Sequence, residues 1–158
     1  MISGTTRVLG VIGDPVAHTS SPAMHNAALK ALGLDYVYVA FHVAPDALPQ
    51  ALAGMRALEL AGLNVTVPHK QAVMAHLDEI SPEAQAIGAV NTVCNRDGKL
   101  LGFNTDAFGI IESLKADGGM DSLPGRVVLL GAGGAARAIL CGLPSVFSSV
   151  VVLRRISR

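Results

Sequence analysis

Short apolar runs alternate along the chain with stretches whose apolar residues recur at helical spacing. Three runs have the length and β-branched content of buried strands: Val8–Ile12, Tyr36–Val43 and Leu63–Val67. A helix is predicted after each run, and Ser20 or Ser21 would cap the first of them: Pro22 to Leu32, Pro45 to Met55 and His69 to Leu77. Leu48, Leu52 and Met55 would form the buried side of the second helix. This alternation predicts an α/β fold with a mostly parallel sheet.

The pattern changes in the second half of the chain. Two strand-like runs, Ala89–Asn95 and Lys99–Asn104, flank an Asp-Gly pair and predict a β-hairpin. A helix should begin at Asp106, with its apolar residues on one side: Phe108, Ile111 and Leu114. Beyond it the order is strand, tight turn, helix and strand: Val127–Leu130, Gly131–Gly134, Ala135–Leu143 and Val150–Leu153. We therefore expect two domains, residues 1–105 and residues 106–158.

Composition narrows the class of protein. Hydrophobic residues make up 51% of the chain and charged residues only 15%, well below the roughly 25% charged residues of typical soluble domains. The formal net charge is zero and like charges do not cluster, which argues against a nucleic-acid partner. Cys94 and Cys141 have no metal-site spacing and are expected to be reduced core thiols. No apolar stretch predicts a signal peptide or a membrane span, so we expect a cytoplasmic protein without a metal.

A glycine-rich turn is the first candidate for function. It fits the pattern G-x-G-x-x-A, and it follows a strand and opens a helix, which is the context that dinucleotide binding requires: Gly131, Ala132, Gly133, Gly134, Ala135 and Ala136. An NAD site would place an acidic residue roughly 20 residues further on. Arginines stand there instead and favour the 2′-phosphate of NADP: Arg154, Arg155 and Arg158. The alternatives are a turn that only packs a helix on a strand, and a basic chain end.

Polar residues near predicted strand ends are the second candidate, because ligands bind at the carboxyl edge of such sheets. Lys70 comes just after one strand, and Asp106 follows another. Thr19 and Ser21 belong to a hydroxyl-rich turn before Pro22. Taken singly, each has a plain structural interpretation, since a lysine is usually solvated and the others are common helix-capping residues.

The order of these segments resembles that of the shikimate dehydrogenase family. The resemblance rests on five blocks: Gly13–Asn26, Asn64–Lys70, Gly88–Thr92, Gly102–Gly109 and Gly131–Arg137. It extends to about Leu140 and implies a shikimate-binding domain followed by a Rossmann-like NADP-binding domain. The implied reaction is the reversible, NADP-dependent oxidation of shikimate to 3-dehydroshikimate. The implied protein is a monomer or a homodimer.

The resemblance also implies roles for single residues. Lys70 would exchange the hydroxyl proton as the carbonyl forms, and Asp106 would act with it as a coupled pair whose resting proton stays unassigned. The hydroxyls of Thr19 and Ser21 would bind the substrate carboxylate. The ring hydroxyls would be held by Thr66, Asn91 and Asp106, with Lys70 alongside. The glycine turn and the three arginines would hold NADP.

The chain departs from the family pattern in three places. Thr19 stands where the family usually has serine, and Leu153-Arg154-Arg155 replaces its usual asparagine-arginine-threonine run. Pro144 interrupts the expected helix. The family continues beyond the equivalent of Arg158, so the resemblance implies a second domain that stops partway and impaired activity. Two alternatives stay open: a quinate/shikimate dehydrogenase that uses NAD, and a shikimate-binding module without catalysis.

Overall fold

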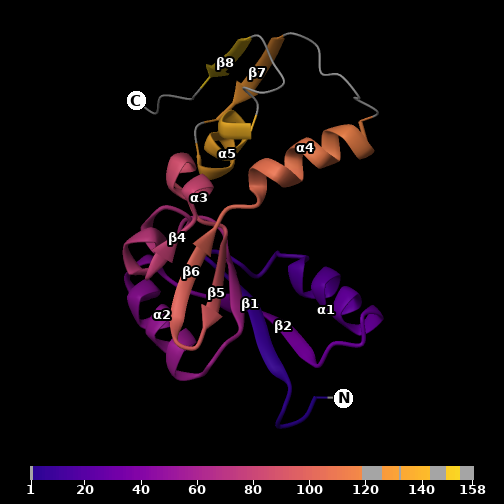
Figure 1. The fold of residues 1–158 in the computed structure, drawn as a ribbon, viewed down its shortest axis with the longest axis vertical. Coiled ribbons are helices and arrows are strands. Elements are labelled where there is room, and N and C mark those ends of the chain that lie inside the picture. Colours follow the sequence, from indigo (N-terminus) through magenta and orange to yellow (C-terminus); the bar gives the residue numbers. More distant parts are fainter. Residues whose placement is uncertain (1, 119–125, 132, 143–148, 154–158) are drawn as a thin grey trace.

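A six-stranded sheet with helices on both faces forms the larger part of the molecule (Figure 1). The computed structural model describes residues 2–118, 126–131, 133–142 and 149–153. The six strands are β1 (Arg7–Gly13), β2 (Tyr36–His42), β3 (Gly62–Val65), β4 (Glu79–Ile80), β5 (Thr92–Arg96) and β6 (Lys99–Phe103). Their order across the sheet is β2-β1-β3-β5-β6-β4, and only β5 runs antiparallel to its neighbours. The predicted mostly parallel α/β sheet is therefore confirmed.

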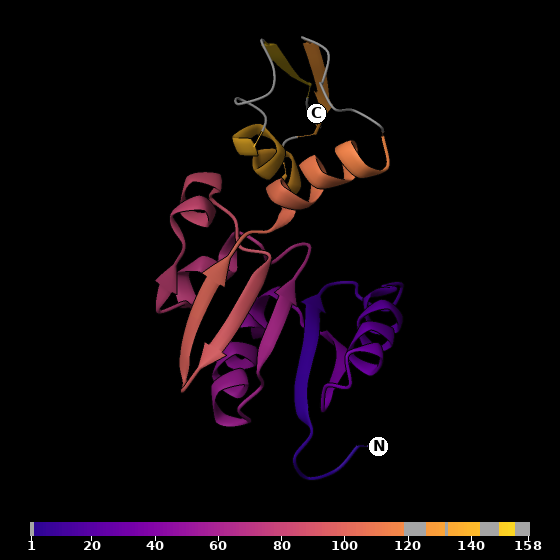
Figure 2. The same cartoon turned by 45° about the vertical axis from the view of Figure 1, so that its right-hand side comes forward.

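Alternation along β1 separates two apolar layers. Val11 packs with Tyr38 and with Leu29 of α1 (Ser21–Ala31) on one face of the sheet. Ile12 points to the other face, where it joins the core under α2 (Leu48–Ala57) and its preceding 3-10 turn η1 (Pro45–Ala47). Helix α1 covers the β1 and β2 side of its face (Figure 2). The strands β3, β5 and β6 therefore keep more room on that face.

Helix α2 supplies the centre of the larger core. Its buried residues are the three that the helical spacing predicted: Leu48, Leu52 and Met55. Leu52 and Met55 have no exposed surface at all. Proline opens the segment because its fixed φ suits a first helical turn and its missing N–H costs nothing there.

The hairpin also forms where the sequence predicted it. Strands β5 and β6 pair antiparallel from Thr92↔Phe103 to Arg96↔Lys99. Asp97 and Gly98 have φ angles of 52° and 84°. Positive φ at both central residues is what a two-residue type I′ turn requires, and aspartate followed by glycine tolerates it best.

Two expectations about residues 69–88 were wrong or incomplete. Residues 69–77 do not form a regular helix, and the segment holds only the 3-10 helix η2 (Ala72–His76). The reason is a long-range bond, because the carbonyl oxygen of Lys70 accepts from the Val90 N–H at 2.7 Å. Helix α3 (Pro82–Ile87) was missed, although Ser81 caps it through Ala84 N at 3.2 Å.

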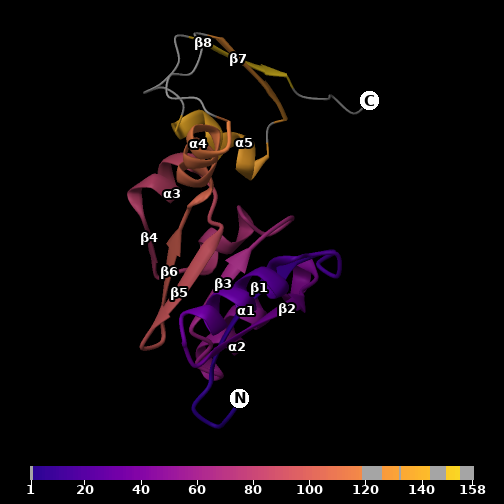
Figure 3. The ribbon, with the colours of Figure 1, turned by 90° about the vertical axis from the view of Figure 1, so that its right-hand side faces the viewer.

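The second part of the chain lies beyond the carboxyl end of the larger sheet in all three ribbon views (Figure 3). It consists of α4 (Asp106–Ala116), β7 (Arg126–Leu130), α5 (Gly134–Gly142) and β8 (Ser149–Leu153). Strands β7 and β8 pair parallel. The predicted division after residue 105 falls between β6 and α4, and independent folding of the two parts remains a prediction. Leu143, the expected end of the second helix, is outside the described residues.

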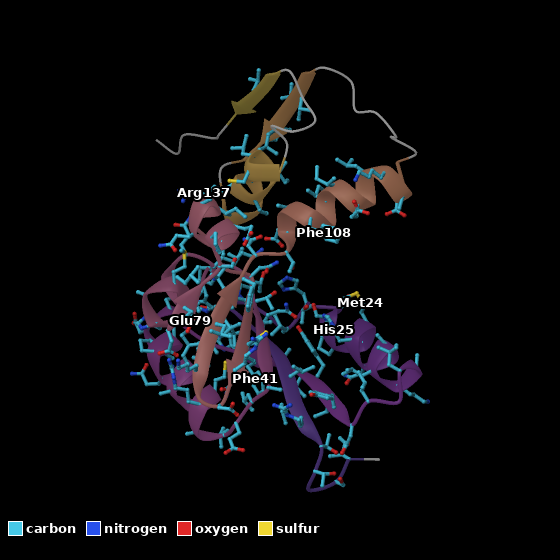
Figure 4. All side chains as sticks on the ribbon, viewed as in Figure 1. Met24, His25, Phe41, Glu79, Phe108 and Arg137 are labelled. Atoms are coloured by element: carbon cyan, nitrogen blue, oxygen red, sulfur yellow. The ribbon has the colours of Figure 1, made fainter. Side chains whose placement is uncertain are left out.

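Small residues join the two parts. Ile87 of α3, Ala89, Ala107 of α4 and Ala138 of α5 form one apolar cluster. Gly142 lies against Ala107 on the neighbouring helix. The predicted apolar residue Phe108 points away from this cluster and is 72% exposed (Figure 4). The inclusion of Phe108 in the packed side of α4 was therefore wrong.

Two further observations concern exposure. Cys94 is half-buried but Cys141 is exposed, so the expectation of two core thiols was wrong for Cys141. On the β7–β8 pair, Val128 and Leu130 are 62% and 79% exposed, and Val151 is 52% exposed. None of the helices within the described ranges is long and apolar enough to cross a bilayer.

The core under α2 yields a stability prediction. Leu52→Ala should lower the free energy of unfolding by about 2–5 kcal/mol, because it leaves a cavity in a layer with no access to solvent. Leu58→Ala is the matched control, since Leu58 at the end of the same helix is 73% exposed and its loss should change stability by only about 0.5 kcal/mol. Urea denaturation followed by circular dichroism measures both. Equal losses would contradict this account of the core.

Candidate functional site

The candidate residues gather at one edge of the larger sheet. Strands β1, β3 and β6 run in the same direction, so their carboxyl ends meet at that edge. The segment after β1 carries Thr19 and Ser21, the segment after β3 carries Thr66 and Lys70, and Asp106 follows β6. In the ribbon views this edge faces α4 and α5 (Figures 1 and 2).

An ion pair lies at the centre of the edge. Lys70 Nζ donates to Asp106 Oδ2 at 2.6 Å, and the side chains are only 17% and 25% exposed. The Lys70 backbone is held by its bond from Val90. Asp106 stands in the first turn of α4, where the free N–H groups of a helix favour negative charge. The sequence therefore identified two residues that the fold brings into direct contact.

Asn91 holds the other side of the carboxylate. Its Nδ2 donates to Asp106 Oδ1 at 2.7 Å and to Thr105 Oγ1 at 3.0 Å. Its Oδ1 accepts from the Thr105 N–H at 3.0 Å. Asn91 is one of the few buried polar residues in the described part of the chain, at 8% exposure. Both carboxylate oxygens are thus bonded, so Asp106 has a single well-defined orientation.

Three polar residues that the sequence interpretation missed extend this network. Thr92 Oγ1 donates to Asn91 Oδ1 at 2.8 Å, and Asn64 Nδ2 lies 3.3 Å from Thr92 Oγ1. The Tyr38 hydroxyl donates to Asn64 Oδ1 at 2.7 Å. A signal for Asn64 was present, because it is two residues before Thr66, and alternate residues of an extended segment face the same side.

Thr19 and Ser21 form the remaining end of the site. Thr19 Oγ1 donates to Ser21 Oγ at 3.0 Å and accepts from the Ser21 N–H at 3.2 Å. Ser20 stands at the predicted N-cap position of α1, but its side chain makes no capping hydrogen bond to the helix. Burial raises the pKa of Tyr38 to about 12, and a hydrogen bond with Ser21 opposes part of that rise. Ser21 therefore lies next to the same tyrosine that reaches Asn64.

A cleft separates the lysine segment from the glycine turn. It measures about 520 Å³ and is lined by Thr66, Val67, Pro68, Lys70, Gln71, Gly133, Gly134 and Ala135. A methyl group added at Gly134 would come within 3.3 Å of Lys70 Cδ. The start of α5 therefore lies close to the Lys70 side chain, and the glycine turn and the lysine segment border the same cleft.

The described part of the turn fits a dinucleotide. Gly131 has a φ of 120°, which L side chains rarely adopt, and a Cβ on Gly133 would meet nothing within 4 Å. Helix α5 begins at Gly134, so its free N–H groups lie at the cleft, where they attract phosphate. The predicted cofactor residues Ala132, Arg154, Arg155 and Arg158 lie outside the described residues.

Fold and site together define a class of α/β protein in which a sheet with a buried lysine–aspartate pair meets a glycine-turn unit across a cleft. Residues 11–93 match the family model described as the shikimate dehydrogenase substrate binding domain. The chain belongs to the shikimate dehydrogenase family.

Individual relatives agree with this assignment. The shikimate dehydrogenase (NADP(+)) of Symbiobacterium thermophilum is 56% identical over 137 residues, which cover 86% of this chain and 46% of that protein. A crystal structure of a shikimate dehydrogenase in complex with NADP+ superposes with a TM-score of 0.92 at 47% identity, covering 98% of this chain and 53% of the other. The Thermus thermophilus enzyme in complex with shikimate gives 0.88 at 49% identity, covering 95% and 57%. The chain spans about half the length of the curated relatives it matches.

The environment of Tyr38 yields a pH prediction. The chain has two tyrosines, so Tyr36→Phe leaves Tyr38 as the only phenol, and its ultraviolet titration should have a midpoint near 12 instead of the ordinary value of about 10. Because the pKa is higher in the folded state, this group's contribution to stability is complete below about pH 10 and declines as the pH rises toward 12. Tyr38→Phe should lack that decline. A midpoint near 10 in the folded chain would contradict the buried, hydrogen-bonded placement.

Proposed function

We propose that this chain provides the substrate-binding part and part of the cofactor-binding unit of an NADP-dependent shikimate dehydrogenase. The reaction is the reversible oxidation of the C3 hydroxyl of shikimate to the ketone of 3-dehydroshikimate. The observation that carries the proposal is the 2.6 Å Lys70–Asp106 pair at the edge of a cleft whose other wall is the glycine turn. The names of the relatives, which are shikimate dehydrogenases of the NADP type, support the same substrate and cofactor.

Lys70 is the proposed proton-transfer residue. Oxidation of an alcohol needs a group that accepts the hydroxyl proton as the C=O bond forms, and the reverse reaction needs the same group to return it. Lys70 accepts that proton when its side chain is a neutral amine, becomes the ammonium partner of Asp106, and returns the proton in the reverse reaction. Asn91 bonds the second oxygen of Asp106, which keeps the pair aimed in one direction throughout. The glycine turn would hold the cofactor, which in its NADP+ form would supply the hydride acceptor for C3 and in its NADPH form the hydride donor for the reverse reaction.

Hydroxyl and amide groups around the pair suit the remaining atoms of shikimate. We assign the substrate carboxylate to the adjacent hydroxyls of Thr19 and Ser21, because O–H donors to an ionised acceptor form strong hydrogen bonds. We assign the ring hydroxyls to Thr66, Asn91 and Asp106. We add Asn64 because its side-chain nitrogen donates to Thr92, the neighbour of Asn91, on the same side of the sheet. These groups offer both donors and acceptors, as a polyhydroxylated ring requires.

The cofactor assignment rests on the glycine turn. Gly131, Gly133 and Gly134 leave the backbone accessible, and the start of α5 would contact the pyrophosphate. Ala132 and Ala135 belong to the same turn. The 2′-phosphate is assigned to the arginines at the end of the chain, since a guanidinium binds phosphate in two-point contact: Arg154, Arg155 and Arg158.

The first test measures binding and turnover on the 158-residue chain itself. Calorimetric titration should detect shikimate binding, and Ser21→Ala should weaken it tenfold or more, since a hydrogen bond to a charged group is worth roughly 1.5–3 kcal/mol. Ser20→Ala, at an exposed neighbour without a side-chain bond, is the control. We expect little NADP-linked oxidation, because Val128 and Leu130 leave one side of β7 uncovered. No shikimate binding, or equal effects of the two serine variants, would contradict the assignment. Normal turnover would contradict the expected impairment.

The second test concerns Lys70. In a chimera completed with the second half of the Symbiobacterium relative, Lys70→Ala should lower kcat by about 10²–10⁴. Shikimate binding should change by less than about tenfold, because the substrate keeps its other contacts. Lys30→Ala, on the exposed end of α1, serves as the control and should retain both values. Steady-state rates over a range of pH separate loss of proton transfer from loss of binding, and an unchanged kcat would exclude Lys70 from the chemistry.

A further inference from the structure

Tyr38 is clamped in place from α1 in two independent ways. Asn26 bonds both backbone groups of Tyr38, with Oδ1 accepting from its N–H at 2.9 Å and Nδ2 donating to its carbonyl at 2.8 Å. His25, labelled in Figure 4, stacks on the Tyr38 ring with centroids 4.2 Å apart and planes 14° apart. The tyrosine is only 3% exposed. Backbone and ring are thus fixed relative to the helix that begins at Ser21.

The position of the ring determines where the hydroxyl lies. The hydroxyl donates to Asn64 Oδ1 at 2.7 Å, and burial raises its pKa to about 12. An asparagine side chain has an acceptor end and a donor end of nearly the same size, so its environment must select the orientation. With Oδ1 occupied by Tyr38, the donor end points to Thr92 Oγ1 at 3.3 Å and to the Asn91 carbonyl at 3.4 Å.

Packing alone does not require this hydroxyl. The apolar partners of Tyr38 are Val11 and Val16, together with Leu9 and Leu29, and a phenylalanine ring would contact them equally well. Tyr36, two residues earlier on the same strand, provides the contrast. Its hydroxyl accepts from Arg7 at 3.1 Å and that contact is exposed, away from the polar network. The hydroxyl of Tyr38 therefore bonds a residue of the proposed substrate site, whereas the hydroxyl of Tyr36 bonds the exposed Arg7.

We propose that Tyr38 is a positioning residue for the substrate site: through its short bond to Asn64 it holds the Asn64 amide in the orientation that is presented to the ring hydroxyls of shikimate. The inference rests on the proposed function, because it takes shikimate as the ligand. Tyr38 also lies beside Ser21, at the carboxylate-binding end of the site. Loss of the hydroxyl removes the short bond at Oδ1 and leaves the Asn64 amide held only by the two longer bonds from its nitrogen, so its orientation becomes less well defined.

The test is a double-mutant cycle on the 158-residue chain. Tyr38→Phe should weaken shikimate binding roughly fivefold to tenfold, as expected for one lost hydrogen bond, and Tyr36→Phe should leave it unchanged. In an Asn64→Ala background, Tyr38→Phe should cause no further loss, because the group it orients is gone. An equal loss in both backgrounds would overturn the proposal and assign Tyr38 a general structural role. An undiminished affinity in folded Tyr38→Phe would overturn it as well.

Two further measurements separate the possible failures. The side-chain NH₂ resonances of Asn64, recorded without ligand, should shift in Tyr38→Phe and stay in place in Tyr36→Phe, and unchanged resonances in Tyr38→Phe would refute the orienting bond. A shikimate analogue that lacks the ring hydroxyl read by Asn64 should bind Tyr38→Phe and the parent chain equally. If the parent chain binds no shikimate, the proposed function fails, and this role for Tyr38 fails with it. If the parent binds and the cycle is additive, only the Tyr38 inference fails.

Discussion

The carboxylate of Asp106 is the point on which the arrangement of the site depends. A partly buried carboxylate is costly unless its oxygens are paired, and here each oxygen has its own partner, Lys70 on one and Asn91 on the other. Lys70 comes from the segment after β3 and Asn91 directly precedes β5, and Asp106 itself begins the helix that leads into the second part of the chain. One charged group therefore links the lysine segment, the hairpin and α4. Any shift of α4 relative to the sheet would directly change the distance between Lys70 Nζ and the Asp106 carboxylate.

Polar groups are concentrated on one face of β3 and β5 because α1 and α2 cover different parts of the sheet. Helix α2 and its neighbours form a dry layer with Ile12 and Leu52. On the other face, α1 covers mainly β1 and β2. The neighbouring strands β3 and β5 carry the paired polar residues Asn64 and Thr92 there. The same alternation that gives these two strands one apolar side gives the other side its hydrogen-bonding groups. On β3 and β5 the core residues and the polar site residues therefore lie on opposite faces, whereas both faces of β1 are apolar.

Local patterns in the sequence predicted the local features of the fold. The spacing of Leu48, Leu52 and Met55 located the buried side of α2, and an Asp-Gly pair located the hairpin turn. The residues at the centre of the site, Lys70, Asp106 and Asn91, were found through motifs, and the fold brings them together; their roles remain proposals. What failed depends on contacts between distant residues. Periodicity could not reveal that the Lys70 carbonyl bonds Val90, or that Tyr38 reaches a residue 26 positions away. The exposed position of Phe108 likewise could not be predicted from its helical spacing.

The parallel pair β7–β8 has a consequence for how the chain behaves at high concentration. Within the described residues each of these strands pairs only with the other, so the outer backbone N–H and C=O groups of both five-residue strands remain open. Strand edges of this kind, flanked by exposed valine and leucine side chains, are templates on which another copy can add a strand. Two-stranded sheets are also marginal on their own. We therefore expect the 158-residue chain to self-associate at high concentration by strand addition at β7 or β8, while the larger sheet stays intact.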